Sequence, residues 1–279
     1  MKSLGVKGNS TEGISATHEE DLKILPSEAP IERPTKSRNR WFLPLFIAIG
    51  LCAVAAFLFS RFNHKPVVSA PLSEHISFVP LQQFSLDEHS FFNEWKEHNF
   101  HGATSYRIVS DQSGEKMLHA WSKGTSSALF KQVSINLSDR PFLSWEWKVT
   151  QFPVHRKNAL LAQANENDFA GRVYVAFKGH TPLTSDVIQY VWDDHLPQGA
   201  FANSPFSKKV KMFVIRSGSS ASQGEWVSEK RDLVKDYEKL FGKSVRGNVT
   251  AIGLMSDSDN TGSSSEAYFR RIAVEKPQA

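Results

Sequence analysis

Apolar and polar positions alternate along most of this chain, but one segment departs from the alternation. From residue 76 onward, apolar side chains recur at every second position within short segments, which is typical of β-strands with one buried face. Residues 41–60 lack this alternation, and the first nineteen of them, Trp41–Phe59, are uncharged and mostly apolar. A helix of that length measures about 28 Å, close to the thickness of a bilayer's hydrocarbon core. The pattern therefore predicts a transmembrane helix over 41–60 and a β-rich domain over 76–279.

The alternation is clearest in FLSWEWKV, residues 142–149, where Leu143, Trp145 and Trp147 share one face. Clusters of Gly, Pro, Asn and Asp separate this segment from its neighbours and predict turns. Because almost no amphipathic helix lies between the predicted strands, we expect them to pack as an antiparallel β-sandwich. The further predicted strands are 104–110, 116–122, 127–133, 171–177, 186–193, 209–218, 248–257 and 266–276.

One short helix is expected within this mainly β domain. In RDLVKDYEKLFG, residues 231–242, apolar side chains recur with a helical period, and Gly242 ends the run. A shorter helical turn is predicted over 91–97. The sequence thus predicts a sandwich whose helices are minor additions to the strands.

The segments that flank the predicted membrane helix differ in composition. Residues 1–40 are polar with mixed charges and are predicted to be a disordered tail. Residues 61–75 contain Pro and Ser and are predicted to be a linker. Four Lys or Arg residues lie at 33–40 and two at 61–65, so the positive-inside rule places the tail in the cytoplasm and 76–279 across the membrane. A cleaved signal peptide is the alternative, but its shorter apolar run would begin nearer the amino terminus.

Composition argues against several classes of function. The single cysteine, Cys52, lies in the predicted membrane helix, so the β domain has no disulfide. The net charge is +4 and no block of cations interleaves with aromatics, so we expect no binding to nucleic acid. The ten histidines show no metal-ligand spacing, and the motifs of serine hydrolases, zinc proteases and phosphate loops are missing from the sequence. We therefore expect no zinc site and no cofactor, apart from the calcium ion considered next.

The loop after the predicted strand 248–257 carries the best candidate for metal binding. Asp257, Asp259 and Asn260 place two carboxylates and an amide on a few residues, as an oxygen-ligated Ca²⁺ requires. The EF-hand pattern fails, because Tyr268 stands where a bidentate Glu is needed. Alternatively, these side chains only shape a turn by accepting backbone N–H bonds. A structural Ca²⁺ ion and a plain turn both remain as interpretations.

A second set of candidates lies in two of the predicted strands. Tyr190 and Trp192 share one face, as expected of either a sugar-stacking platform or core packing, and Asp193 lies on the other. Arg172, in an otherwise apolar strand, is expected either to pair with a buried carboxylate such as Asp168 or to bind an anionic ligand. The candidate ligand-binding residues are therefore Tyr190, Trp192, Asp193 and Arg172.

Seven motifs follow one another between residues 84 and 275: FLSWEWKV, NDFAGRVYVAF, IQYVWD, a Leu-Pro-x-Gly loop, GEWVSEKRDLVKDYEKLFG, AIGLMSDSDNT and AYFRRI. In this order they resemble a bacterial family known as domain of unknown function 3047. That family more usually has Thr where Ser256 and Ser258 stand here, and both Asp residues of its motif are kept. The resemblance implies an exported β domain with the jelly-roll fold of carbohydrate-binding modules, and it implies no established activity or catalytic residue.

The sequence as a whole predicts a membrane-anchored, noncatalytic β-sandwich that binds a ligand or an envelope protein. Carbohydrate is the expected ligand class. The alternative is an envelope glycan hydrolase that uses Asp193, Asp257 or Asp259 as acid or base. Hydrolases hold such carboxylates about 5–10 Å apart in an open cleft, so their placement separates the two hypotheses. The expected location is the cell inner membrane, with a single span and a periplasmic carboxyl-terminal domain.

Overall fold

The structure, a computed structural model, describes residues 77–179, 184–218 and 224–278. These residues belong to one compact unit, Leu72–Ala279. Within the described ranges, no helix is both long enough and apolar enough to cross a bilayer. Three predicted segments lie outside the described residues: the tail 1–40, the membrane helix 41–60 and the linker 61–75.

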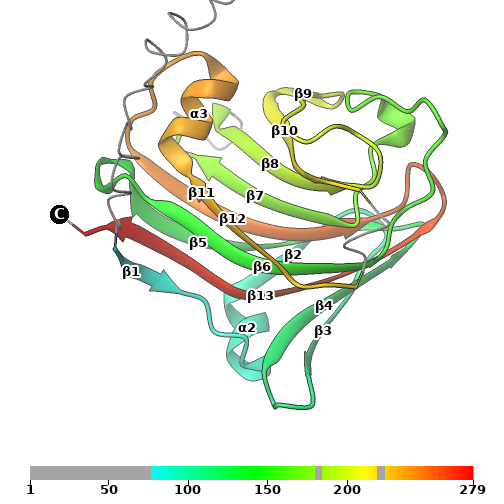
Figure 1. Ribbon diagram of the computed structural model, residues 1–279, viewed down its shortest axis with the longest axis horizontal. Coiled ribbons are helices and arrows are strands. Elements are labelled where there is room, and N and C mark those ends of the chain that lie inside the picture. Colours follow the sequence, from blue (N-terminus) through cyan, green and yellow to red (C-terminus); the bar gives the residue numbers. More distant parts are fainter. Residues whose placement is uncertain (1–76, 180–183, 219–223, 279) are drawn as a thin grey trace, which may run out of the picture. The chain divides into compact units, whose positions relative to one another are not determined.

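The described residues form two β-sheets packed into a sandwich-like fold, which confirms the prediction of a mainly β domain (Figure 1). Sheet A consists, in spatial order, of β11 (Val227–Asp232), β6 (Phe142–Gln151), β13 (Ser264–Pro277), β4 (Lys116–Lys123) and β3 (Ser105–Ser110), with β1 (Phe78–Gln83) paired to β13. Sheet B consists of β2 (Trp95–His101), β5 (Ser126–Asn136), β12 (Asn248–Asp257), β7 (Gly171–Phe177), β8 (Asp186–Asp193), β10 (Ser207–Ser217) and β9 (Phe201–Ser204).

The hydrophobic core lies between the two sheets and follows from the period-2 pattern of the strands. In β6 every second side chain is buried, whereas the side chains between them are partly exposed. Strands β7 and β8 are buried on nearly both faces, as the continuous apolar character of their sequences indicates. The inward side chains of β6 are Leu143, Trp145, Trp147 and Val149.

Sheet B is mixed rather than wholly antiparallel, which corrects the sequence prediction. Strand β10 runs parallel to β8, while β9 pairs with β10 in the antiparallel sense. The chain leaves β8, forms the short strand β9, and turns back into β10, which lies between β8 and β9. No strand is predicted over residues 201–204, because Gly, Pro and Asn surround them. The strand forms because β10 offers it an open edge.

Two α-helices, rather than one, occur among the described residues. Helix α3 (Leu233–Phe241) lies within the predicted 231–242; Asp232 accepts the N–H groups of its first turn, and Gly242 ends it with a φ of 66°. Helix α2 (Glu88–Glu94) begins and ends earlier than the predicted 91–97, because the chain from Trp95 onward pairs with β5 as an edge strand. Two 3₁₀ turns, η1 (Leu137–Asp139) and η2 (Ala164–Glu166), complete the helical elements.

The outer face of sheet B, which points away from the core, is covered along only part of its length. The connection between β6 and β7, residues 152–170, places Leu161 and Phe169 over Val191, Met212 and Val214. Beyond this cover, the side chains of β5, β7 and β12 form a separate small apolar cluster. A half-covered sheet therefore leaves a depression beside the 152–170 connection.

Candidate functional site

A cleft of ≈ 510 Å³ occupies the uncovered part of the outer face of sheet B. Its lining comes from all seven strands of this sheet and from the loops at their ends. The five central strands, β5 to β10, alone span about 19 Å, because neighbouring strands lie about 4.8 Å apart. The cleft thus crosses the strands and is long enough for an extended ligand.

Aromatic side chains form both the floor and the rim of the cleft. On the floor, the rings of Phe130 and Tyr174 meet edge to face with centroids 5.4 Å apart. At the rim, Phe100 is 56% exposed and Phe206 is 68% exposed. Such exposure of large apolar rings is costly in water unless a partner covers them. The four rings offer flat apolar surfaces in the cleft and at its edge.

Gly253 allows this aromatic floor to form. It pairs with Phe130 on one side and Tyr174 on the other, so its position lies between the two rings. A Cβ atom at residue 253 would lie 2.5 Å from the Phe130 ring and 3.1 Å from Tyr174 Cβ. Only a residue without a side chain leaves room for the Phe130 ring to lie across the strand.

We expect Gly253→Ala to displace the Phe130 ring and to lower the free energy of unfolding by about 1–3 kcal/mol, the usual cost of overpacking. Urea denaturation measures the change. The matched control is the same substitution in a Phe130→Ala background, where only the 3.1 Å approach to Tyr174 Cβ remains and the added methyl group should cost less. An equal cost in both backgrounds would contradict the role assigned to Gly253.

The polar end of the cleft is organised around Arg172, which is 2% exposed. Its Nε and Nη2 donate to the two carboxylate oxygens of Asp257 at 2.8 and 2.5 Å, a bidentate pair. Its Nη1 donates to Asn167 Oδ1 at 3.3 Å and to Gln189 Oε1 at 3.1 Å. The Phe169 ring lies 4.5 Å from the guanidinium carbon. Arg172 therefore pairs with an internal carboxylate, which is Asp257 rather than the expected Asp168.

Burial and the charge of the partner act in opposite directions on the pKa of each member of this pair. Burial raises the pKa of Asp257 to about 7, although the charge and hydrogen bonds of Arg172 act in the opposite direction. For Arg172, burial by itself would lower the pKa, but the Asp257 charge outweighs it and the pKa is raised. The guanidinium is therefore a permanent cation at the end of an apolar cleft.

The loop that follows β12 is held by Asp168 rather than by its own aspartates. Asp168 accepts the backbone N–H groups of Asn260 and Thr261, at 3.2 and 2.6 Å, and the Thr261 hydroxyl at 2.7 Å. Carboxylate oxygens of Asp168, Asp257 and Asp259 lie within 4.8 Å of one another. Asp259 and Asn260 also line the cleft. The structure thus brings the predicted metal-binding residues together at the cleft.

The donor set at this loop fits a calcium ion poorly. Both oxygens of Asp257 already accept from Arg172, and those of Asp168 accept from the loop. A Ca²⁺ ion needs six to eight oxygen ligands, and here it would lie beside a buried guanidinium of like charge. Asp259 Oδ1 has no hydrogen-bond partner among the described residues. The arrangement instead indicates a braced loop in which this Asp259 oxygen is a buried acceptor.

Tyr190 and Trp192 lie in the core between the sheets and are both 0% exposed. The Tyr190 ring packs against Trp145 and the Trp192 ring against Trp147, with centroids 5.6 and 5.5 Å apart. Neither ring is available to a ligand at the surface, so of the two interpretations offered by the sequence, core packing describes both residues. The two side chains point away from the cleft because β8 turns its other face toward it.

Asp193, the last residue of β8, lies apart from the cleft. Its Oδ1 accepts the backbone N–H groups of His195 and Leu196 at 2.8 and 2.6 Å. The side chains of Asp194, His195 and His155 surround it. Asp193 therefore shapes the loop after β8 and belongs to a different cluster from Asp257 and Asp259.

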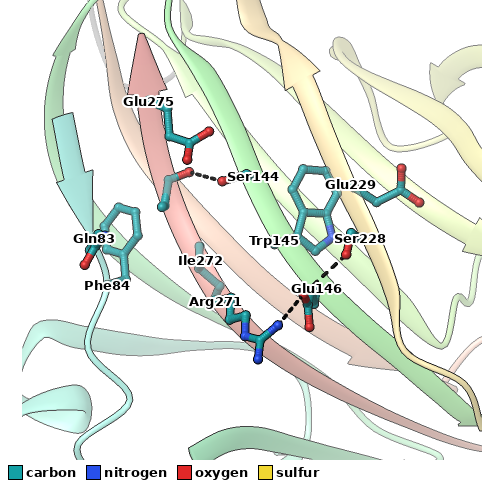
Figure 2. A pocket seen from close by; sticks show the side chains of 11 residues that line it. Gln83, Phe84, Ser144, Trp145, Glu146, Ser228, Glu229, Arg271, Ile272 and Glu275 are labelled. Atoms are coloured by element: carbon teal, nitrogen blue, oxygen red, sulfur yellow. Dashed lines mark hydrogen bonds and ion pairs between the residues drawn. The ribbon is translucent and has the colours of Figure 1, made fainter. Parts of the chain in front are cut away.

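A second cavity of ≈ 450 Å³ lies on sheet A, where β13 bulges at Arg271 (Figure 2). Figure 2 shows Arg271 from β13 and Ser228 from β11 converging on Glu146 of the strand between them, at 2.9 and 3.3 Å. Arg270 donates to the same carboxylate at 2.7 Å. The charged side chains of this cavity already pair with one another. The cavity is therefore a weaker candidate for a ligand-binding site than the cleft.

Several cleft residues could not be singled out from the sequence. The rings of Phe100 and Phe206 carry no motif, and neither residue falls in a predicted strand. Asn167 and Gln189 become important only because the fold aims them at Arg172. Alternation does place Arg172, Tyr174 and Ala176 on one face of β7, so this part of the lining follows from the strand pattern.

The model of the family described as "Protein of unknown function (DUF3047)" matches residues 93–273. The chain belongs to this family. The matched range runs from the end of α2 into β13, and every residue that lines the cleft falls within it. No curated protein matches the chain.

Solved structures that resemble the chain have low sequence identity. A family 11 carbohydrate-binding module from Clostridium thermocellum has 12% identity and a TM-score of 0.35, and the match covers 72% of this chain and 97% of the module. The xyloglucanase domain of NopAA from Sinorhizobium fredii, solved with cellobiose, has 11% identity and a TM-score of 0.37, with 71% and 98% covered. An adhesin domain of Lys-gingipain from Porphyromonas gingivalis has 12% identity and a TM-score of 0.34, with 73% and 99% covered.

Proposed function

We propose that the domain binds a carbohydrate chain in the cleft on the outer face of sheet B. The observation that carries this proposal is the combination of exposed aromatic rings with a fixed polar end. A sugar ring has an apolar C–H face and a rim of hydroxyl groups, so it complements a flat aromatic ring on one side and hydrogen-bonding groups on the other. Phe100 and Phe206 supply the rings, and Asn260 and Gln189 lie where hydroxyl groups would be bound.

The length and openness of the cleft favour a chain over a single sugar. An extended oligosaccharide can lie across the strands and contact the rim at Phe100 and Phe206. At the polar end, the side chain of Asn260 lines the cleft and can bind hydroxyl groups of the ligand. Arg172 holds the amide side chains of Asn167 and Gln189 in place, so this end is preorganised.

Binding without hydrolysis is the function that the carboxylates support. A glycosidase needs two carboxyl groups that flank the scissile bond, one of them free to donate a proton and the other free to act as base or nucleophile. Asp257 is bound by Arg172, and Asp168 by the backbone of the loop. Asp193 lies in a separate cluster. The unpartnered oxygen of Asp259 is buried, so these carboxylates do not form the accessible pair of a glycan hydrolase.

We further propose that residues 41–60 anchor this module in the cell inner membrane, with the domain in the periplasm. The support is the apolar run Trp41–Phe59 and the excess of Lys and Arg on its amino-terminal side. In that location the cleft would face the glycans of the bacterial envelope. The proposed partner is therefore an envelope polysaccharide.

A reporter fused after Ala279 tests the proposed topology. Alkaline phosphatase in this position should be active and β-galactosidase inactive, because the cations at 33–40 hold the tail in the cytoplasm. Reversal of these two activities would contradict the orientation. A mature chain that begins near Pro71 would show that 41–60 is removed and does not anchor the protein.

A glycan array with the fragment 72–279 tests carbohydrate binding directly. The fragment contains both sheets and the whole core, so it presents the intact cleft. We expect selective binding to one class of polysaccharide, followed by a measurable affinity for its oligosaccharides in calorimetry. Absence of binding to any glycan, together with capture of fatty acids or other apolar ligands, would contradict the proposal.

A further inference from the structure

Four side chains meet at the carboxyl end of β8, outside the cleft. Asp193 is the last residue of β8, Asp194 and His195 follow it, and His155 comes from the connection between β6 and β7. Each offers one potential ligand atom, and these atoms all lie within 4.8 Å of one another. Two imidazoles and two carboxylates thus converge from two different segments of the chain.

The hydrogen bonds of the two histidines fix which ring nitrogen faces the cluster. His155 Nε2 lies 2.9 Å from the carbonyl oxygen of Asp168, and His195 Nε2 lies 3.3 Å from that of Ala159. A carbonyl oxygen accepts but does not donate, so both Nε2 atoms carry the proton. In each neutral ring Nδ1 is then a bare lone pair, and both Nδ1 atoms face carboxylates. Lone pairs and carboxylates repel one another unless a cation lies between them.

Two buried atoms of the cluster lack a hydrogen-bond partner among the described residues. One is Nδ1 of His155, whose side chain is 4% exposed, and the other is Oδ2 of Asp193, whose side chain is 0% exposed. His155 Nδ1 lies 3.5 Å from Asp194 Oδ1, which shows that it points into the cluster. Buried polar atoms are nearly always satisfied in folded proteins, so both atoms call for a partner.

We propose that His155, Asp193, Asp194 and His195 bind a divalent transition-metal cation, with Zn²⁺ as the matching probe. Neutral imidazoles with two carboxylates form a tetrahedral donor set for Zn²⁺ and balance its charge, whereas Ca²⁺ prefers oxygen ligands throughout. In a tetrahedron with metal–ligand bonds of about 2.0–2.1 Å, ligand atoms are about 3.3 Å apart. Nδ1 of His195 lies 3.1 Å from Asp193 Oδ1 and Nδ1 of His155 lies 3.5 Å from Asp194 Oδ1, on either side of that spacing. Nδ1 of His195 and Asp194 Oδ1 lie 2.8 Å apart, at hydrogen-bond distance.

The surroundings of the cluster match those of a metal site. Each imidazole donates its Nε2–H to a carbonyl oxygen, which orients the ring toward the proposed metal. A backbone N–H group orients Asp193 in the same way. Asp194 and His195 are each 30% exposed in their side chains, which gives an ion a path from solvent. No local motif indicates this site, because its two histidines are forty residues apart in the sequence.

The proposed metal would join two segments that build one wall of the cleft. His155 lies in the 152–170 connection, which also carries Asn167 to the cleft. The metal would fasten this connection to the end of β8. Its role would be structural, so ion binding should stabilise the domain whatever ligand the cleft accepts.

A proton is the competing occupant. Burial lowers the pKa of His155, and likewise that of His195, but the nearby carboxylates of Asp194 and Asp193 outweigh burial and raise both values above the usual 6.5. Two imidazolium ions would also balance two carboxylates. A proton-held cluster would bind no metal, which makes the two occupants distinguishable by titration.

The test uses the full-length chain, purified in detergent without a polyhistidine tag and stripped with chelator. We expect calorimetry at pH 7.5 to show one Zn²⁺ per chain, and Zn²⁺ at a hundredfold excess over its Kd to raise Tm by about 5–10 °C. Asp194→Asn and His195→Gln, both at partly exposed positions, should weaken binding at least tenfold. His119→Gln is the matched control, since His119 also pairs with a carboxylate, Glu266, at 2.7 Å, and it should leave binding unchanged.

Three results would overturn the proposal. The first is no stoichiometric binding and no change in Tm, which would leave a proton-held cluster. The second is binding that His195→Gln and Asp194→Asn leave intact, which would place the ion elsewhere. The third is tighter binding of Ca²⁺ than of Zn²⁺, which would exclude imidazole ligation. X-ray absorption of the zinc-loaded protein should show two nitrogen ligands at about 2.0–2.1 Å.

Discussion

Arg172→Ala is expected to lower the free energy of unfolding by about 3–5 kcal/mol, because it leaves the Asp257 carboxylate buried without its partner. That is a large part of the 5–15 kcal/mol that holds a typical domain folded. The substitution also releases Asn167 and Gln189, which accept from the same guanidinium. Urea denaturation followed by far-ultraviolet circular dichroism measures the loss.

The control for this prediction is an exposed ion pair of the same domain. Lys116 and Asp87 lie 3.0 Å apart with side chains 48% and 53% exposed, so Lys116→Ala should change the free energy of unfolding little. Replacing both Arg172 and Asp257 with apolar residues of similar volume should recover much of the stability. Equal costs for Arg172→Ala and Lys116→Ala would contradict the account of the buried pair.

The double substitution Phe100→Ala and Phe206→Ala is expected to weaken oligosaccharide binding by about a hundredfold. Each exposed ring should contribute about tenfold, roughly 1.4 kcal/mol, as aromatic side chains at binding sites commonly do. Stability should change little, since both rings are largely exposed. Isothermal titration calorimetry measures the affinity, and thermal melting measures the stability.

Trp121 is the matched control for the cleft aromatics. It is 41% exposed and lies on β4 of sheet A, away from the cleft, so Trp121→Ala should leave the affinity unchanged. An affinity that falls equally with Trp121→Ala would place the binding site elsewhere. An affinity that survives the double substitution would exclude the rim as a contact surface.

Much of the fold could be predicted from the sequence, because the alternation of apolar and polar residues along a strand indicates which of its faces is buried. Leu143, Trp145 and Trp147 share a face in the sequence pattern and lie together in the core. The parallel placement of β10 beside β8 could not be predicted, since it depends on which strand edge β10 meets in the folded domain. Local patterns specify which side of a strand is buried, but not which strands become neighbours.

The candidate site was only partly predictable, for a related physical reason. Arg172 stood out because a charge in an apolar strand needs a partner, and the loop aspartates stood out because polar residues cluster there. Their pairing joins positions 85 residues apart, which no local pattern encodes. Tyr190 and Trp192 were ambiguous in the sequence. Aromatic side chains on one face of a strand indicate either a sugar-stacking platform or a core, and only the packing of the second sheet decides between the two.

Methyl resonances of the ¹³C-labelled fragment 72–279, followed during titration with its best oligosaccharide, test the central claim most directly. Val187, Val210 and Met255 line the cleft on sheet B, whereas Ile272 lines the second cavity on sheet A. The account predicts that the three cleft residues shift along one binding isotherm while Ile272 stays in place. Shifts at Ile272 with an unperturbed cleft would contradict it.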